Sequence, residues 1–189
     1  NVPMPQNNLS DTDVAAVGLA ACGGGAHEFS GYALEPAQQV GAVTLPDLAD
    51  GGAEFTMRAP ADGLLLVYFG YTNCPHECPT TMTDAAAVQA DLGDRVEVAM
   101  VTVDPGRDLA GLADYVGGFT PTGHALGTDD PSRLRAAADA FGVTYQVQND
   151  QVAHSTHLYG VDDTGTVVMT WTFPTPLDAL RADVKALLG

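Results

Sequence analysis

The sequence has little positive charge, few cysteines and no long apolar run. Seven Lys and Arg residues stand against 24 Asp and Glu residues, which gives a formal net charge of −17. Such a charge repels the phosphates of nucleic acids, so we exclude nucleic acid as a partner. Three cysteines in 189 residues are too few for a disulfide-rich scaffold. No stretch reaches the roughly 18 to 20 apolar residues that span a bilayer.

The chain does have the apolar content needed to bury one sizeable core, because 46% of its residues are hydrophobic. Apolar runs of strand length alternate with helical patterns. We expect strands at 40–45, 54–57, 63–70, 95–104, 142–147, 156–162 and 165–173. We expect helices at 80–92, 108–116, 132–141 and 177–188. This order predicts an α/β fold: a mixed sheet with helices on both faces and an N-terminal β-hairpin around residues 50–52.

Two of the cysteines, Cys74 and Cys78, lie where the apolar strand 63–70 gives way to a helix. Unpaired backbone N–H groups and the helix dipole favour a thiolate at such a place, so we expect a lowered cysteine pKa. His76, between the two cysteines, favours a thiolate in the same way if it is protonated. The alternative for His76 is an ordinary solvated loop residue.

The spacing of this pair bears on its chemistry. Side chains at positions i and i+4 of a helix have Cβ atoms about 5–6 Å apart, whereas a relaxed disulfide needs about 3.8 Å. A metal ion bonded to both sulfurs at about 2.3 Å tolerates a wider separation. The spacing therefore favours a shared metal without excluding oxidation. Two buried cysteines with no chemical role are the remaining alternative.

Cys22 has a different setting, in the stretch "VGLAACGGG". This stretch resembles the lipobox of bacterial lipoproteins, in which the cysteine after residues 19–21 is lipidated and becomes the mature N-terminus. We expect residues 1–28 to be a signal-peptide remnant and a flexible tether, and residues 29–189 to form a single domain without internal repeats. The alternative is a small apolar cysteine in a flexible N-terminus.

Four segments carry a family resemblance: "VYFGYTNCPHECPTTM", "VTVDPGRD", "AFGVTYQV" and "AHSTHLYGVDDTG". Their order and spacing resemble the Sco/SenC family of copper proteins, from about residue 40 to the C-terminus. The resemblance implies a thioredoxin-like fold and a role in assembling the dinuclear copper site of cytochrome c oxidase subunit II.

By position, the resemblance implies that Cys74, Cys78 and His154 are the copper ligands. Two thiolates and one imidazole form a soft donor set that suits Cu(I) and can accommodate Cu(II). Two positions depart from the family pattern: Ala153 stands where an aspartate usually precedes the histidine, and His76 stands where an aspartate commonly lies between the cysteines. Neither change removes an implied ligand.

The remaining candidates are expected to have lesser roles. His157 follows His154 by three residues, and in one regular strand the two side chains point to opposite faces. We therefore expect His154, and not His157, to reach the cysteines. His27 and His124 have the pattern of surface residues. We expect three residues of the "VTVDPGRD" stretch to shape the loop beside the site without binding metal: Asp104, Pro105 and Arg107.

Three functions fit these residues. The first is a copper metallochaperone that serves cytochrome c oxidase subunit II and depends on a partner that reduces the cysteine pair. The second is an extracytoplasmic thiol–disulfide reductase in which Cys74 and Cys78 act on the cysteines of that subunit. The third is a peroxidase in which Cys74 reacts with peroxide, and Cys78 then resolves the oxidised Cys74. We also expect the protein to lie on the outer face of a bacterial cytoplasmic membrane, held by lipid on Cys22, because of the lipobox-like stretch, the glycine tether and the membrane location of the target that the resemblance implies.

Overall fold

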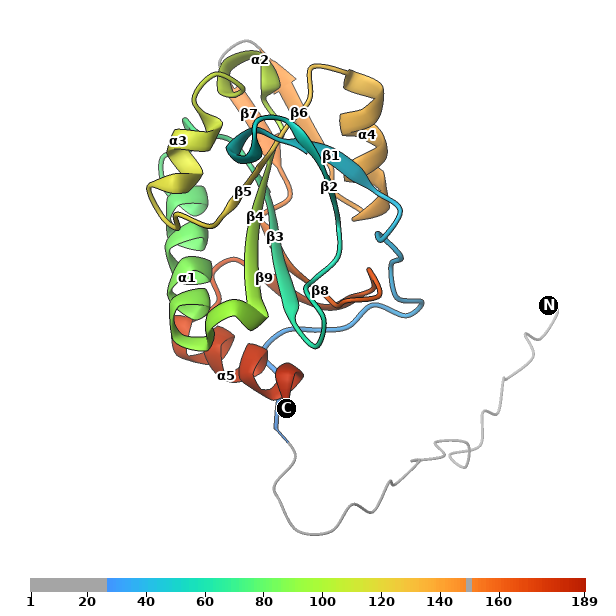
Figure 1. The fold of residues 1–189 in the computed structure, drawn as a ribbon, viewed down its shortest axis with the longest axis vertical. Helices are drawn as coiled ribbons and strands as arrows, with labels where there is room; N and C mark the ends of the chain where they lie inside the picture. Colours follow the sequence, from blue (N-terminus) through green and yellow to red (C-terminus); the bar gives the residue numbers. More distant parts are fainter. Residues whose placement is uncertain (1–26, 149–150) are drawn as a thin grey trace, which may run out of the picture.

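Seven strands form one mixed sheet in the computed structural model, which describes residues 27–148 and 151–189. The strands are β1 (Thr44–Asp47), β2 (Ala53–Thr56), β3 (Leu64–Gly70), β4 (Val96–Thr102), β5 (His124–Leu126), β8 (His157–Val161) and β9 (Val167–Thr172). They lie in the order β2-β1-β5-β4-β3-β8-β9 (Figure 1). β3 is parallel to β4 and antiparallel to β8, and β4 is parallel to β5. β6 (Tyr145–Gln148) and β7 (Gln151–His154) form a separate two-stranded ribbon.

The central strand β3 is buried along its whole length. Because strand side chains alternate between faces, its residues enter two different cores. Leu64, Leu66 and Tyr68 contribute to one core, whereas Leu65 and Phe69 belong to the other. The continuous apolar run in the sequence is therefore explained by a strand that is covered on both sides.

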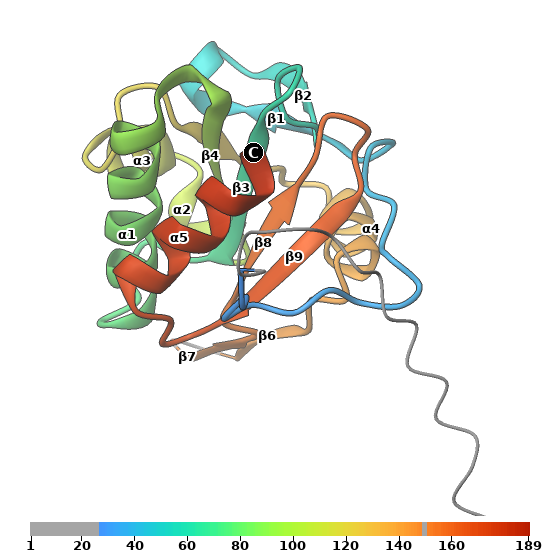
Figure 2. The same cartoon turned by 90° about the horizontal axis from the view of Figure 1, so that it is seen from below.

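Helices supply that cover on both faces, as the sequence predicts (Figure 2). The core that contains Tyr68 is closed by α1 (Glu77–Leu92), α3 (Leu112–Gly117) and α5 (Leu177–Leu188). The opposite core is closed by α4 (Pro131–Ala140). Three short segments complete the set: α2 (Pro105–Asp108), η1 (Leu48–Asp50) and η2 (Gly93–Arg95). No helix within the described residues is both long enough and apolar enough to cross a bilayer.

The helix boundaries differ from expectation where proline and glycine intervene. α1 begins at Glu77, three residues before the predicted start, and so includes Pro79 in its first turn. A proline fits there because the first N–H groups of a helix have no intrahelical partner. The predicted helix at 108–116 is wrong: the chain forms α2 and then α3, and Gly111 lies between them. α5 has the predicted bounds.

The N-terminal hairpin is confirmed, with β1 antiparallel to β2. Its first strand starts at Thr44 and not at residue 40, because Val43 donates a backbone hydrogen bond to Val40 and closes a turn before the strand. Two strands, β5 and β7, were not expected. β5, with three residues, is too short to show an alternating pattern, whereas β7 has four residues, as many as the predicted strands β2 and β6.

Candidate metal centre

The cysteine pair lies on the loop and first helical turn that follow β3. Cys74 is in the loop and is 7% exposed, and Cys78, in the first turn of α1, is fully buried. The Cys78 backbone N–H donates a hydrogen bond of 3.3 Å to the Cys74 sulfur. Gly70, at the end of β3, leaves room for this arrangement, because a Cβ there would lie 3.0 Å from the Cys78 sulfur.

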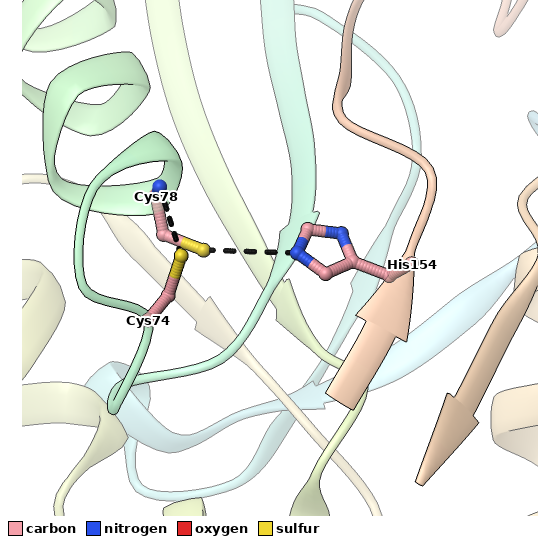
Figure 3. A group of neighbouring side chains, drawn as sticks. All are labelled: Cys74, Cys78 and His154. Carbon is pink, nitrogen blue, oxygen red and sulfur yellow. Dashed lines mark hydrogen bonds between the residues drawn. The ribbon is translucent and has the colours of Figure 1, made fainter. Parts of the chain in front are cut away.

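The third group, His154, comes from the end of the β6–β7 ribbon. Its Nε2 atom points at the cysteines and lies 3.9 Å from the Cys78 Sγ (Figure 3). One nitrogen of His154 and the sulfurs of Cys74 and Cys78 all lie within 4.8 Å of one another. Residues 76 positions apart in the chain are thus brought together.

The His154 ring is oriented by its neighbours. Its Nδ1 lies 2.8 Å from the carbonyl oxygen of Ser155. A carbonyl can only accept, so Nδ1 carries the proton and the Nε2 lone pair faces the cysteines. The rings of Tyr68 and Tyr71 meet the imidazole edge-on, with centroid distances of 6.1 and 5.6 Å. The Ser155 carbonyl therefore fixes the tautomer and orients the ring.

The electrostatics of the site differ from the sequence-based expectation. Burial, together with the hydrogen bond to Cys74, raises the pKa of Cys78 to about 12. The predicted lowering of the cysteine pKa is therefore wrong for Cys78, because desolvation at a fully buried sulfur outweighs the helix dipole. Burial lowers the pKa of His154 and so favours the neutral imidazole, the form that binds metals.

The loop that carries Cys74 is fastened to the neighbouring strand through Asp108. Asp108 is 1% exposed and accepts hydrogen bonds from the Thr72 N–H (3.0 Å) and the Thr72 hydroxyl (2.6 Å). The Thr102 hydroxyl, at the end of β4, donates a third bond of 2.6 Å. Sequence reasoning missed Asp108, although it belongs to the "VTVDPGRD" stretch. In that stretch Asp104 forms an ion pair with Arg107, and the role of these residues in shaping the loop stays a prediction.

The other histidines lie apart from the cluster. His157 starts β8 and pairs with Thr172 of β9, whereas His154 ends β7, so the two histidines lie in different strands. His76 is exposed at the start of α1.

His124 corrects a prediction, because it is part of β5 and only 20% of its side chain is exposed. Its Nδ1 lies 2.8 Å from the buried carboxylate of Asp47. His27 is exposed, as expected, and bonds to Asp183 at 2.7 Å. Cys22 lies outside the residues that the structure describes.

The cluster fits a soft metal ion better than a hard one. Its donors are two sulfurs and one imidazole nitrogen, whereas calcium and magnesium select oxygen ligands. Two donors bonded to one ion at about 2.0 to 2.3 Å lie about 3 to 4 Å apart. The 3.9 Å between Cys78 Sγ and His154 Nε2 is within that range. This donor set is of the kind that suits a soft metal ion such as copper.

Comparison with known sequences identifies a family. The SCO1/SenC family model matches residues 44–189. Protein SenC of Rhodobacter capsulatus is 35% identical over 135 residues, which are 67% of this chain and 60% of that protein. A SCO2-like protein of Rickettsia prowazekii is 31% identical over 113 residues, which are 54% of this chain and 55% of that protein. The chain thus spans between 55% and 60% of the length of these two relatives.

Solved structures agree with the sequence comparison. The solution structure of apo Sco1 from Thermus thermophilus superimposes with a TM-score of 0.71 at 29% identity, covering 87% of this chain and 99% of that one. Arabidopsis thaliana ScoI, solved with copper bound, gives a TM-score of 0.68 at 26% identity, covering 78% of this chain and 98% of that one. The predicted thioredoxin-like fold is confirmed.

Proposed function

The chain belongs to the SCO1/SenC family, and from that premise we propose that it is a copper metallochaperone. The observation that carries the proposal is the cluster of Cys74, Cys78 and His154, whose donor atoms lie within 4.8 Å of one another. Copper in the structure of the Arabidopsis relative supports the choice of metal.

The recipient in this proposal is subunit II of cytochrome c oxidase, whose dinuclear copper site receives the ion. Cysteine and histidine ligands of the recipient replace those of this chain one at a time, so that copper is never released to water. The position of the site favours such an exchange. His154 belongs to the two-stranded ribbon and not to the main sheet, so its movement need not break the strand pairing of that sheet.

A second candidate function is thiol–disulfide reduction, and one observation favours it. The two thiols are free, and the Cys78 N–H lies 3.3 Å from the Cys74 sulfur, so the pair is close. Oxidation of the pair to a disulfide would pass two electrons and two protons to a disulfide of the recipient subunit, which becomes two thiols. The buried, high-pKa sulfur of Cys78 is a poor attacking group, which leaves Cys74 as the attacking one.

Copper titration of the reduced protein tests the main proposal. We expect one copper per chain, and we expect Cys74→Ser and Cys78→Ser each to abolish tight binding. A Cys74–Cys78 disulfide has no thiolate, so oxidised protein should bind copper orders of magnitude more weakly than reduced protein. Undiminished copper affinity in both serine variants would sink the proposal.

The two histidines separate copper carriage from simple thiol exchange. His154→Ala should weaken Cu(II) binding strongly and remove the intense thiolate-to-copper absorption. His157→Ala is the matched control and should leave both unchanged, because His157 pairs with β9. If His157→Ala removed the absorption while His154→Ala preserved it, His157 would be the ligand. If neither variant changes copper binding, reduction of the recipient becomes the better account.

Location and domain organisation are also part of the proposal. We place the protein on the outer face of a bacterial cytoplasmic membrane, held by lipid on Cys22. In this proposal residues 1–28 are a signal-peptide remnant and a flexible tether, and residues 29–189 are the copper-binding domain. A lipoprotein cysteine that carries several acyl chains holds firmly, whereas one chain holds only marginally. Mass spectrometry of the native protein decides the matter: an unmodified Cys22 still joined to Ala21 would refute the anchor.

A further inference from the structure

Glu77 lies between the two cysteines and has no role in the site described above. We propose that its carboxylate is a fourth, oxygen donor that completes the centre when it holds Cu(II) and is dispensable when it holds Cu(I). This inference rests on the proposed function, because it concerns how the same centre treats the two oxidation states of its cargo.

The position of the carboxylate carries the argument. Glu77 is the first residue of α1 and is half-buried. Its Oε2 lies 3.7 Å from the Cys74 sulfur, which donates a long hydrogen bond to it. That separation is within the about 3 to 4 Å expected between two donors on one ion. Metal binding removes the thiol proton that this hydrogen bond uses, which leaves the carboxylate oxygen facing the ion.

The donor set has room for such a group. Cu(I) is satisfied by a few soft ligands, whereas Cu(II) favours tetragonal sites that include nitrogen and oxygen donors. The cluster offers two sulfurs and one nitrogen. The Glu77 carboxylate is the nearby anionic oxygen.

A simpler account is that Glu77 only stabilises the helix, since acidic side chains are favourable in the first turn. That account requires a negative charge but no particular side-chain length, and it predicts equal effects on the binding of Cu(I) and Cu(II). The two accounts can therefore be separated by a variant that keeps the charge and shortens the side chain.

The experiment compares wild type with Glu77→Gln and Glu77→Asp, using Asp94→Asn as the control. Asp94 is an exposed carboxylate in η2, beyond the other end of α1. Reduced protein is titrated with Cu(II) and, separately, with Cu(I), each against a competing chelator. The Cu(II) form is also examined by electron paramagnetic resonance.

We expect Glu77→Gln to weaken Cu(II) binding about 10- to 100-fold and to change Cu(I) binding by less than about 3-fold, as this oxygen is not needed for Cu(I). Each tenfold loss that is specific to Cu(II) corresponds to a rise of about 59 mV in the copper reduction potential. Glu77→Asp should resemble Glu77→Gln, because the shorter side chain no longer reaches. The resonance spectrum should change in both variants and stay unchanged in Asp94→Asn.

Two results would overturn the inference while leaving the proposed function intact: an equal loss for Cu(I) and Cu(II) in Glu77→Gln, or wild-type Cu(II) binding in either variant. If wild-type protein bound neither ion, the proposed function would fail, and this inference with it.

Discussion

At the scale of single residues, Tyr68 lies beneath the metal centre. Its phenol oxygen is 3.6 Å from the Cys78 sulfur. Burial first, and the charge of Cys78 second, raise the pKa of Tyr68 well above its ordinary value, so the phenol keeps its proton. A hydrogen bond to a ligating sulfur withdraws electron density from it and so tunes the potential of a copper–thiolate site.

Tyr68→Phe removes that donor and should leave the thiolate more basic. We expect a stronger preference for Cu(II), about tenfold, seen as a fall of about 59 mV in the reduction potential, and a shifted thiolate-to-copper absorption band. Folding stability should drop by about 1 kcal/mol. Tyr159→Phe is the control, because Tyr159 packs into the core on the opposite face. An unchanged potential in Tyr68→Phe would contradict this role.

At the scale of secondary-structure elements, α2 holds the cysteine loop against β4. The link is the buried carboxylate of Asp108, which accepts two hydrogen bonds from Thr72 in the loop and one from Thr102 at the end of β4. The backbone N–H of Val103 also donates to the carbonyl of Gly70 at 2.8 Å, which ties the ends of β3 and β4 together. The position of Cys74 therefore depends on a helix 36 residues away from Thr72.

Asp108→Ala should loosen this loop as well as destabilise the fold. Loss of a buried charged acceptor leaves its donors unpaired, and we expect a cost of about 2 to 4 kcal/mol in the free energy of unfolding. Copper affinity should also fall at a temperature where the variant is still folded. The control is Asp130→Ala, which removes the N-cap of α4 and should cost about 1 kcal/mol. If Asp130→Ala reduced copper affinity as much as Asp108→Ala, general destabilisation would explain both.

At the scale of the whole molecule, Asp183 of α5 binds the N-terminal segment to the domain. It is 1% exposed and accepts hydrogen bonds from the Trp171 ring (2.8 Å), His27 (2.7 Å) and the Ser30 N–H (2.9 Å). Burial alone raises the pKa of Asp183, but these bonds outweigh it and lower the pKa to about 2. Sequence reasoning did not identify this residue.

The lowered pKa makes folding stability depend on acid. A carboxyl whose pKa is depressed in the folded state stabilises it fully above the unfolded value of about 4 and loses that contribution as pH falls toward 2. We expect wild type to lose stability between about pH 4 and pH 2 more steeply than Asp183→Asn, which should be about 2 to 3 kcal/mol less stable at pH 7. Chemical denaturation at a series of pH values in this range measures the free energy of unfolding of both proteins. If the plots of unfolding free energy against pH were parallel for the two proteins, Asp183 would contribute nothing to the acid dependence of stability.

The sequence by itself determined the long buried strands and the identity of the candidate donor residues. Apolar runs indicated β3 and β4 because strands covered on both faces are almost continuously apolar: β3 is buried at every position, and β4 at every position except Glu97. Pro176 set the start of α5, whose predicted bounds are those observed. Cys74 and Cys78 were identified because their four-residue spacing at a strand-to-helix junction is a local property. The short strand β5 had no such local pattern, so His124 was misplaced.

Only the tertiary structure decided what surrounds each of these residues. Residue type and spacing could not show that Asp108 accepts from Thr72, or that Ser155 orients His154. The direction of the shift in the Cys78 pKa depended in the same way on the fold, because a helix N-terminus lowers a thiol pKa and burial raises it. The helix start is local in sequence, whereas burial is set by elements distant in the chain. Those distant elements cover the Cys78 sulfur only once the sheet has formed.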